Sequence, residues 1–276
     1  MLFRSISGVS VAGNIITIYQ AIFIALGAAI SSLISKTLAQ GDKECLAYHT
    51  AEAIKLTLLL SALLGLISLL FGRQMLDLLG TEKAVAEAGG LYLALVGGTI
   101  VLLGLMTSFG ALVRVTRNPR FPMYVSLLTN VLNALFSALG IYVFQLGIVG
   151  VALGTVLARL VGVLILWREL DLSTIRWIWG LDGELLRLSL PAAGERLMMR
   201  AGDVVIIAIV VTFGTDAVAG NAIGEVLTQF NYMPAFGVAT ATVMLAAHAV
   251  GEGDMQAVGR ITKRSEERRV GKECRS

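Results

Sequence analysis

Long apolar stretches separated by short polar turns run through most of this 276-residue chain. A helix that crosses the hydrocarbon core of a bilayer needs about 20 mostly apolar residues. No stretch shows the sustained apolar–polar alternation of a transmembrane barrel strand. The pattern predicts an all-α integral membrane protein, a polytopic helical bundle with seven spans near residues 11–36, 53–72, 89–113, 122–145, 147–167, 189–213 and 219–249.

Composition supports the same class. Apolar residues make up 56% of the chain and charged residues 15%, with a mean hydropathy of +0.80, whereas soluble domains average about 25% charged residues. A soluble fold cannot bury this much apolar surface, so the expected partner is the lipid bilayer. We expect no nucleic acid partner, because the formal net charge of +3 comes from the two ends of the chain.

Both ends resemble translated sequencing adapters. The resemblance covers residues 1–5 and 264–276, and we predict that neither segment belongs to the fold. The tail holds five basic and three acidic residues and Arg4 adds one basic residue, so the remainder is formally neutral. The chain is then expected to be part of a longer protein, and Cys45 is its one cysteine outside the tail. A single cysteine forms neither an internal disulfide nor a metal site.

Lysine and arginine alternate between loops in the way that membrane orientation requires. Basic residues enrich the first, third, fifth and seventh loops, at Lys43, Arg117, Arg176 and Arg260 among others. The fourth and sixth loops carry none, and the second mixes basic with acidic residues. Basic loops stay in the cytoplasm. We therefore expect the first span to enter from outside, which requires at least one earlier span.

Two distant segments repeat one layout, which indicates related halves. Each begins with Ala-Gly-Asn and ends with Gly-Asp, at residues 12–14 and 41–42 in one and at 219–221 and 253–254 in the other. Internal repeats are typical of secondary transporters. We predict an N-terminal lobe over 6–170, a linker over 171–188 at the longest polar break, and the start of a C-terminal lobe over 189–263.

Motifs along the chain resemble the multidrug and toxic compound extrusion (MATE) transporters. In order they are Leu76-Asp77-Leu78-Leu79-Gly80, the loop from Arg114 to Pro119, Asn130-x-x-Asn133, Gly147-x-x-Gly150 with Thr155, Leu190-Pro191-Ala192-Ala193 with Glu195-Arg196-Leu197, and Phe213-Gly214-Thr215. The resemblance implies twelve helices in two lobes around a central cavity, of which this chain carries helices two to eight. It also implies a monomer in the bacterial inner membrane that exports amphipathic, often cationic compounds in exchange for H⁺ or Na⁺. With incomplete lobes, the chain alone is expected to be inactive.

A polar stripe in the fourth span is the first candidate site. Ser126, Asn130, Asn133 and Ser137 follow one another at spacings of four, three and four residues, which places them on one helix face. Such a stripe either lines a cavity or bonds a neighbouring helix, and the resemblance favours the cavity. Proton-coupled relatives often have an Asp where Ser137 stands, and Thr155 falls where the family adds a hydroxyl to the same pocket.

The apolar part of the sixth span is too short to cross a membrane by itself. This part, 204–213, covers only ten residues, so the helix must extend back through Glu195, Arg196, Arg200 and Asp203. Charges at membrane depth are candidate functional groups, and we expect Glu195 to bind a cation or proton. Two alternatives are a structural ion pair between Arg200 and Asp203 and snorkelling of Glu195 and Arg196 to the cytoplasmic interface.

The last span carries a second polar face. Asn221, Glu225, Thr228 and Tyr232 share it and Gln229 adjoins it, which predicts the C-terminal wall of the cavity. The alternative places Asn221 and Glu225 in water at the outer interface. Lys36 and His248 stand at equivalent positions before the two Gly-Asp pairs and are expected to satisfy the last carbonyls of their helices.

Motifs of common enzymes and of ATP-binding phosphate loops are absent from the sequence. We therefore predict a cation-coupled secondary transporter with no cofactor beyond its coupling ion and no catalytic or metal site. One alternative is a flippase for lipid-linked oligosaccharides on the same fold, with Arg159, Arg196 and Arg200 as candidate basic residues. A more distant alternative is an intramembrane enzyme, although His49 and His248 share no motif.

Overall fold

The computed structural model describes residues 2–78, 83–170, 183–211 and 215–273. In these ranges the chain is helical apart from short connections, and no strand occurs in them. The helices are α1 (Leu2–Gln40), α2 (Lys43–Leu78), α3 (Lys83–Tyr92), η1 (Leu93–Gly97), α4 (Ile100–Thr116), α5 (Phe121–Ala138), η2 (Leu139–Val143), α6 (Ile148–Glu169), α7 (Glu184–Val211), α8 (Thr215–Glu252) and α9 (Met255–Glu273).

The predicted all-α membrane bundle is confirmed. Within the described residues, five helices are long and apolar enough to cross a membrane, and the pair formed by 89–97 and 100–116 makes a sixth. Helix α7 has the length of a span but is not among them, in agreement with the charged residues that interrupt its apolar stretch.

The third predicted span is bent, which the apolar pattern did not indicate. Its two parts meet at 45°, where the π-helical turn η1 ends and Gly97 is followed by Gly98. The hydroxyl of Thr99 donates to the carbonyl of Leu95 at 2.7 Å. Glycine pairs and π-turns are common causes of such kinks.

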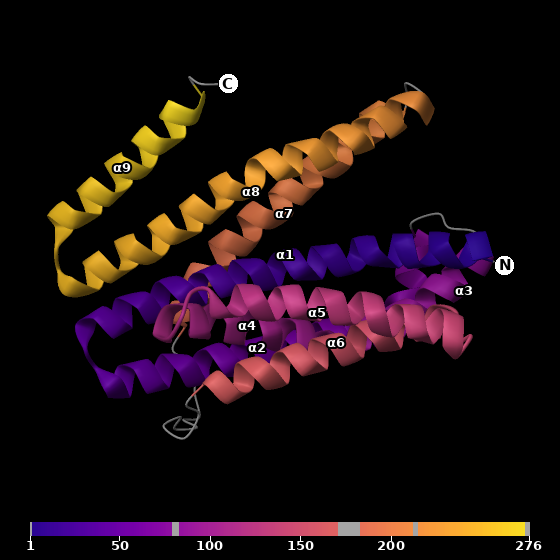
Figure 1. Ribbon diagram of the computed structural model, residues 1–276, viewed down its shortest axis with the longest axis horizontal. Coiled ribbons are helices and arrows are strands. Elements are labelled where there is room, and N and C mark those ends of the chain that lie inside the picture. The colour runs from indigo at the N-terminus through magenta and orange to yellow at the C-terminus, as the bar shows by residue number, and fades with distance from the viewer. Residues whose placement is uncertain (1, 79–82, 171–182, 212–214, 274–276) are drawn as a thin grey trace.

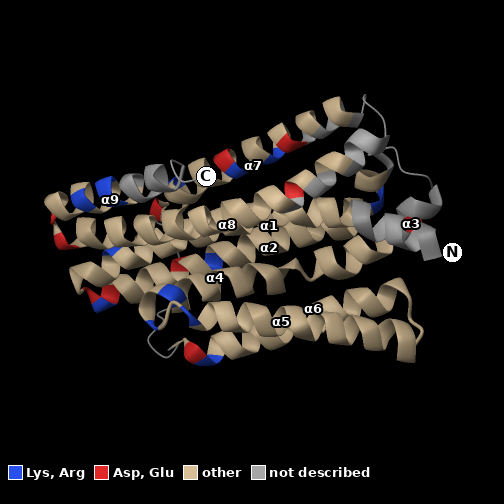
Figure 2. Cartoon of the chain, turned by 45° about the horizontal axis from the view of Figure 1, so that its top comes forward, with Lys and Arg blue, Asp and Glu red and all other residues tan. Residues whose placement is uncertain are grey.

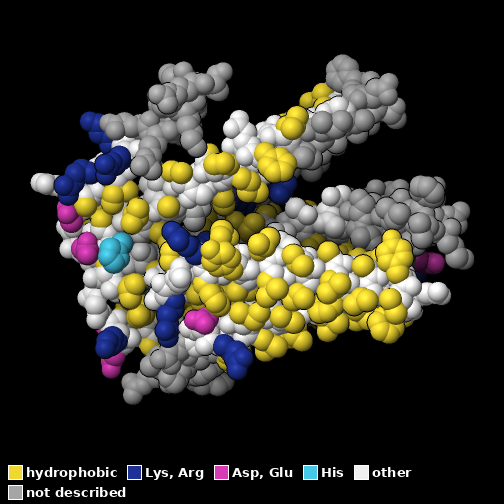
Figure 3. Space-filling model, in the orientation of Figure 1, with side chains coloured by type: hydrophobic (Ala, Val, Ile, Leu, Met, Phe, Trp, Pro, Cys, Tyr) yellow, Lys and Arg dark blue, Asp and Glu magenta, His cyan; other side chains and the backbone are white. Residues whose placement is uncertain are grey.

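Helix α1 lies at the centre of the bundle, between α2 to α4 on one side and α7 and α8 on the other (Figure 1). Its buried side chains Phe23, Ile30 and Ile34 join the core with Phe109 and Leu112 of α4. Exposed apolar side chains cover α5 and α6 (Figure 3), including Leu127, Val131, Leu157 and Leu164, which suits a lipid-facing surface.

Glycines bring α5, and the π-helical turn η2 that follows it, into close contact with α6. A Cβ atom at Gly150 would lie 2.7 Å from the backbone of Gly140, and one at Gly154 would lie 2.7 Å from the backbone nitrogen of Ser137. Small residues that let two backbones approach are typical of helix pairs in membranes. This contact fixes the positions of the polar residues on α5 and α6 relative to each other.

The connections alternate between the two ends of the bundle. The α1–α2 and α8–α9 connections lie at one end, on the left of Figure 1, and the α5–α6 connection lies at the other. Lys and Arg gather at the first of these ends (Figure 2), which we name the basic end. The alternation expected from the loop charges is therefore present in the described connections.

The two Gly-Asp turns have matching geometry. Gly41 and Gly253 adopt φ angles of +73° and +79°, a region open mainly to glycine. Asp42 accepts a hydrogen bond from the backbone of Cys45 and caps α2, and Asp254 accepts one from Ala257 and caps α9. The repeat read from the sequence thus extends to local structure.

Helices α7 and α8 meet α1 closely only near the basic end. The Ser35 hydroxyl donates to the carbonyl of Met244 at 2.8 Å, and a Cβ atom at Gly251 would collide with the Lys36 carbonyl group. Ala249 is buried, whereas most described side chains from 224 to 243 are exposed. Away from the basic end, α7 and α8 lean away from α1 (Figure 1).

The predicted linker and the two adapter-like ends lie only partly within the described residues. Residues 171–182 of the predicted linker lie outside the described residues, and its last residues, 184–188, form the first turn of α7. The adapter-like ends are helical over 2–5 and 264–273, while residues 1 and 274–276 lie outside the described residues. Their assignment as adapter sequence stays a prediction.

Candidate substrate and cation site

The polar stripe of α5 forms a hydrogen-bonded group with α6. The side-chain amide of Asn133 donates to the hydroxyl of Thr155 at 3.3 Å, and Ser137 donates to the Asn133 carbonyl oxygen at 3.2 Å. Thr155 donates in turn to the backbone carbonyl of Val151. Asn130 is exposed. Asn133 thus bonds a neighbouring helix, which is one of the two interpretations of the stripe. Substrate binding by these residues stays a prediction.

The charged residues of α7 are accessible rather than buried. Arg200 and Asp203 form an ion pair at 3.3 Å, with side chains 46% and 52% exposed. The guanidinium of Arg196 lies 4.6 Å from the ring centre of Phe236 on α8. Glu195 is exposed and has no hydrogen bond or ion pair to any described residue. The alternative of a structural pair is therefore realised for Arg200 and Asp203, while binding of a cation or proton by Glu195 stays a prediction.

The predicted polar face of α8 is present on one continuous helix. The side-chain amide of Asn221 donates to Glu225 at 3.3 Å, and the Thr228 hydroxyl donates to the carbonyl of Gly224 at 2.8 Å. Glu225, Thr228 and Gln229 are exposed. Because hydroxyls and carboxylates here keep free acceptor positions, they can receive a cation or a substrate donor.

A cation–π contact between α7 and α8 was not predicted from the sequence. Phe236 stacks on Tyr232 with ring centres 6.0 Å apart, and the guanidinium of Arg196 lies over the Phe236 ring. A guanidinium within about 6 Å of a ring centre is attracted to it. Nothing in the spacing along α7 indicates this partner, because the aromatic residue belongs to another helix.

The three groups of candidate residues do not form one compact site. No hydrogen bond or ion pair between described residues links the Asn133 group to α7, or the α7 charges to Glu225 on α8. The described residues also contain no cluster of three or more His, Cys, Asp or Glu side chains that suits a metal ion. The candidate residues therefore form separate polar groups, one on α5 and α6, one on α7 and one on α8.

Arg159, a candidate basic residue of the flippase alternative, lies near the middle of α6. Its Nη1 atom is buried and has no hydrogen-bond partner in the described part of the chain. Leaving a buried charged donor unpaired is costly. This arginine is therefore a point at which an anionic group would be stabilised.

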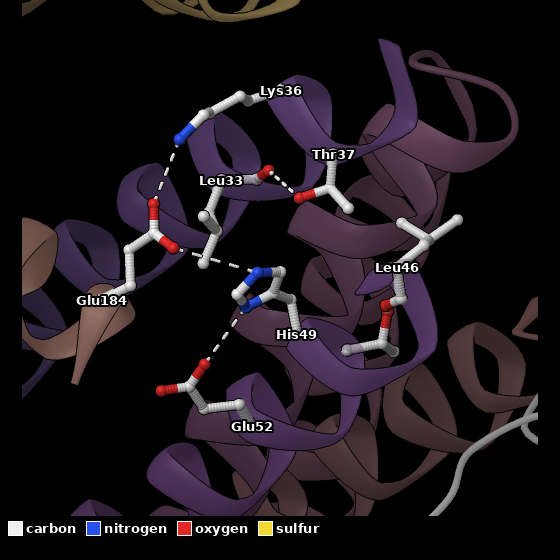
Figure 4. A network of polar contacts seen from close by, with 8 residues as sticks. Leu33, Lys36, Thr37, Leu46, His49, Glu52 and Glu184 are labelled. Atoms are coloured by element: carbon white, nitrogen blue, oxygen red, sulfur yellow. Dashed lines mark hydrogen bonds and ion pairs between the residues drawn. The ribbon is translucent and has the colours of Figure 1, made fainter. Parts of the chain in front are cut away.

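A four-residue cluster at the basic end was also missed. Lys36 forms an ion pair with Glu184 at 3.1 Å, and Nδ1 of His49 lies 3.2 Å from Oε2 of Glu52 (Figure 4). Lys36 was expected to satisfy helix carbonyls, and that expectation is wrong for its amino group, which reaches α7 instead. The long sequence separation between Lys36 and Glu184 leaves no pattern that could have revealed the pair.

This arrangement defines a class: a polytopic helical membrane protein with two parts that join at one end, and with accessible polar groups on its long helices. A family model described as MatE matches residues 4–139 and 191–265, and the chain belongs to this family. The matched ranges fall on either side of the predicted linker. Members of the family are transporters rather than enzymes, so the predicted family is confirmed.

Individual relatives agree with the family. The chain is 24% identical to "Probable multidrug resistance protein NorM" of Thermotoga maritima over 93% of its own length and 58% of the relative's. It is 25% identical to "Probable multidrug resistance protein YoeA" of Bacillus subtilis, over 87% of the chain and 55% of the relative. The chain therefore spans about half the length of the curated relatives that it matches.

Solved structures share the fold. A crystal structure of MATE in complex with MaD3S matches with a TM-score of 0.84 at 20% identity, covering 94% of this chain and 61% of that one. An outward-facing conformation of a multidrug resistance MATE family transporter matches with a TM-score of 0.82 at 19% identity, over 94% and 60% of the two chains.

Proposed function

We propose that this chain is part of a cation-coupled exporter of amphipathic or cationic compounds. The observation that carries the proposal is the set of accessible charges on α7, a helix of spanning length. Charged groups at membrane depth are costly and mark ion or substrate pathways. The names of the relatives as multidrug resistance proteins support the same substrate class.

The proposed orientation places the basic end in the cytoplasm of a bacterium, because cytoplasmic loops are rich in Lys and Arg. The bundle is then closed toward the cytoplasm, where α1 contacts α7 and α8. Helices that lean apart at the other end suit a state open to the outside (Figure 1). We expect a monomer in the inner membrane.

Coupling requires only that two ligands favour different states of the same protein. An external H⁺ or Na⁺ binds an acidic group, for which Glu195, Asp203 and Glu225 are the candidates. Asn130, Asn133, Ser137 and Thr155 would contact the exported compound from the opposite lobe. No resident cofactor is part of this proposal.

The test measures dye efflux by the protein expressed from the complete reading frame that contains this chain. Imposed Na⁺ and H⁺ gradients are compared in reconstituted vesicles, for the parent and for Glu195→Gln. We expect one of the two gradients to drive efflux and the Gln variant to lose the gradient-driven part. The matched control is Glu87→Gln, which removes an exposed carboxylate paired with Arg73 and is expected to leave efflux unchanged. Efflux that is equal in the parent and in Glu195→Gln would remove Glu195 from the mechanism.

The unpaired Nη1 of Arg159 favours one second candidate, a flippase for lipid-linked oligosaccharides, because their pyrophosphate groups are anionic. Against it, Arg200 is already paired with Asp203 and Arg196 is engaged by Phe236. A fluorescent lipid-linked pyrophosphoryl sugar, assayed for translocation in the same vesicles, separates the two. Translocation of this lipid without dye efflux would contradict the exporter proposal and support the flippase.

A further inference from the structure

The basic end holds a carboxylate and an imidazole that are almost completely removed from solvent. The side chains of His49 and Glu52 on α2 are 6% and 2% exposed, and they contact each other at 3.2 Å. An ionised carboxylate at such a site is costly unless it is paired with a positive charge. A proton on His49 would supply that charge and would make Nδ1 a donor to Glu52.

The other ring nitrogen of His49 faces a different helix. Its Nε2 lies 4.0 Å from Oε2 of Glu184, and Oε1 of the same carboxylate pairs with Lys36 on α1 (Figure 4). Glu184 begins α7, so a single carboxylate near the predicted lobe boundary contacts both α1 and α2 of the N-terminal lobe.

Protonation of His49 changes the sign of this contact. When His49 is charged, both ring nitrogens donate, one toward Glu52 and one toward Glu184. When it is neutral with its proton on Nδ1, a lone pair on Nε2 faces the Glu184 carboxylate and repels it. The cluster of Lys36, His49, Glu52 and Glu184 is neutral in the first case and carries one net negative charge in the second.

We infer that His49, Glu52 and Glu184 form a proton-binding site at the basic end that fastens α7 to the N-terminal lobe. The proton holds the two parts together at this end, and its loss loosens them. This site is distinct from the coupling-ion groups proposed on α7 and α8, and it operates whichever ion drives transport. In the proposed orientation it senses the pH of the cytoplasm.

The groups around His49 come from three helices. On α2 they are Glu52, Tyr48, whose ring meets the imidazole edge-on, and Cys45, one helical turn away. Helix α1 supplies Lys36 and α7 supplies Glu184. Asp42 lies at the start of α2 and accepts a hydrogen bond from the backbone of Cys45 at 3.1 Å.

The accessibility of Cys45 can report whether α7 is held against the N-terminal lobe at the basic end. Cys45 is partly buried, shares a helix face with His49, and lies close enough to Glu184 and Lys36 to experience their charges. Movement of α7 away from this end should expose the thiol. The measurement is the rate of maleimide labelling of Cys45 in everted membrane vesicles, with the complete protein and with all other cysteines replaced by serine.

The first comparison is made at one pH between Glu184→Gln and its matched control. We expect Glu184→Gln to label at least threefold faster than the parent protein, because α7 is released. Asp42→Asn removes a negative charge from beside the same thiol, keeps a good helix cap, and touches neither Lys36 nor His49. A rate for Glu184→Gln no higher than that of Asp42→Asn would overturn the proposal, because charge alone would then explain the change.

The second comparison tests the proton. Each labelling rate is divided by that of N-acetylcysteine at the same pH, which removes the titration of an ordinary thiol. We expect the corrected rate of the parent to fall at least twofold as the pH is lowered from 8 to 6, and that of His49→Gln to stay flat. An equal pH response in the parent and in His49→Gln would assign the titration to another group. The labelling assay measures no transport. A negative result therefore rejects the proton-binding site without rejecting the exporter proposal, and a negative efflux result does not reject the proton-binding site.

Discussion

Gly154→Ala provides the sharpest test of how α5 and α6 pack. A Cβ atom at this position would lie 2.7 Å from the backbone nitrogen of Ser137 and 3.0 Å from the carbonyl carbon of Phe136. Non-bonded heavy atoms pack favourably at about 3.5–4.0 Å. Both contacted atoms belong to the backbone, so no side-chain rotation relieves the overlap and the helices must separate.

The expected cost follows from two opposing terms. Overpacking in a close-packed interior costs about 1–3 kcal/mol, while replacing Gly by Ala within a helix gains at most about 1 kcal/mol. Separation of the helices also lengthens the Asn133–Thr155 hydrogen bond, which at 3.3 Å is already long, and an interhelical hydrogen bond in a membrane is worth about 0.6 kcal/mol. We expect a net loss of about 2 kcal/mol in the free energy of unfolding.

The assay is thermal unfolding of the complete protein in detergent. The shift in Tm is about 2–4 °C per kcal/mol for 150–250 residues and decreases with chain length, so Gly154→Ala should lower the Tm of the complete protein by a few degrees. The control is Gly110→Ala in α4, a buried glycine whose added Cβ would meet only Pro122, at 3.7 Å. Its Tm should stay the same or rise. A Tm for Gly154→Ala equal to that of the control would refute the close approach of α5 and α6.

Three further predictions concern single contacts. A double-mutant cycle of Arg196→Gln and Phe236→Leu should give a coupling of about 0.5–1 kcal/mol in the free energy of unfolding, and no coupling would dismiss the α7–α8 contact at 4.6 Å. A cycle of Asn133→Ala and Thr155→Val should give about 0.6 kcal/mol, whereas strictly additive losses in Tm would mean that the hydrogen bond does not form. Gly41→Ala, at φ +73°, should lower the stability by about 1–2 kcal/mol, and a variant as stable as the parent protein would contradict the left-handed conformation of this turn.

Much of the fold could be predicted from the sequence because it depends on short-range physics. Apolar runs of spanning length, basic residues in alternate loops and the two Gly-Asp turns are local properties, and the described structure contains all three. The spacing of Asn133 and Ser137 placed them on one helix face, where they are hydrogen-bonded to each other. Helical periodicity fixes such relations without reference to any partner.

The tertiary structure alone decided which faces meet. Pairing of Glu184 with Lys36 and its approach to His49, the position of Arg196 over Phe236, and the buried Nη1 of Arg159 all depend on the rotation and crossing of whole helices. The sequence by itself determined that this protein is a membrane bundle with polar groups on particular helix faces. Which of those groups pair across helices was decided by packing, because a helix fixes its own 3.6-residue period but not its orientation toward its neighbours.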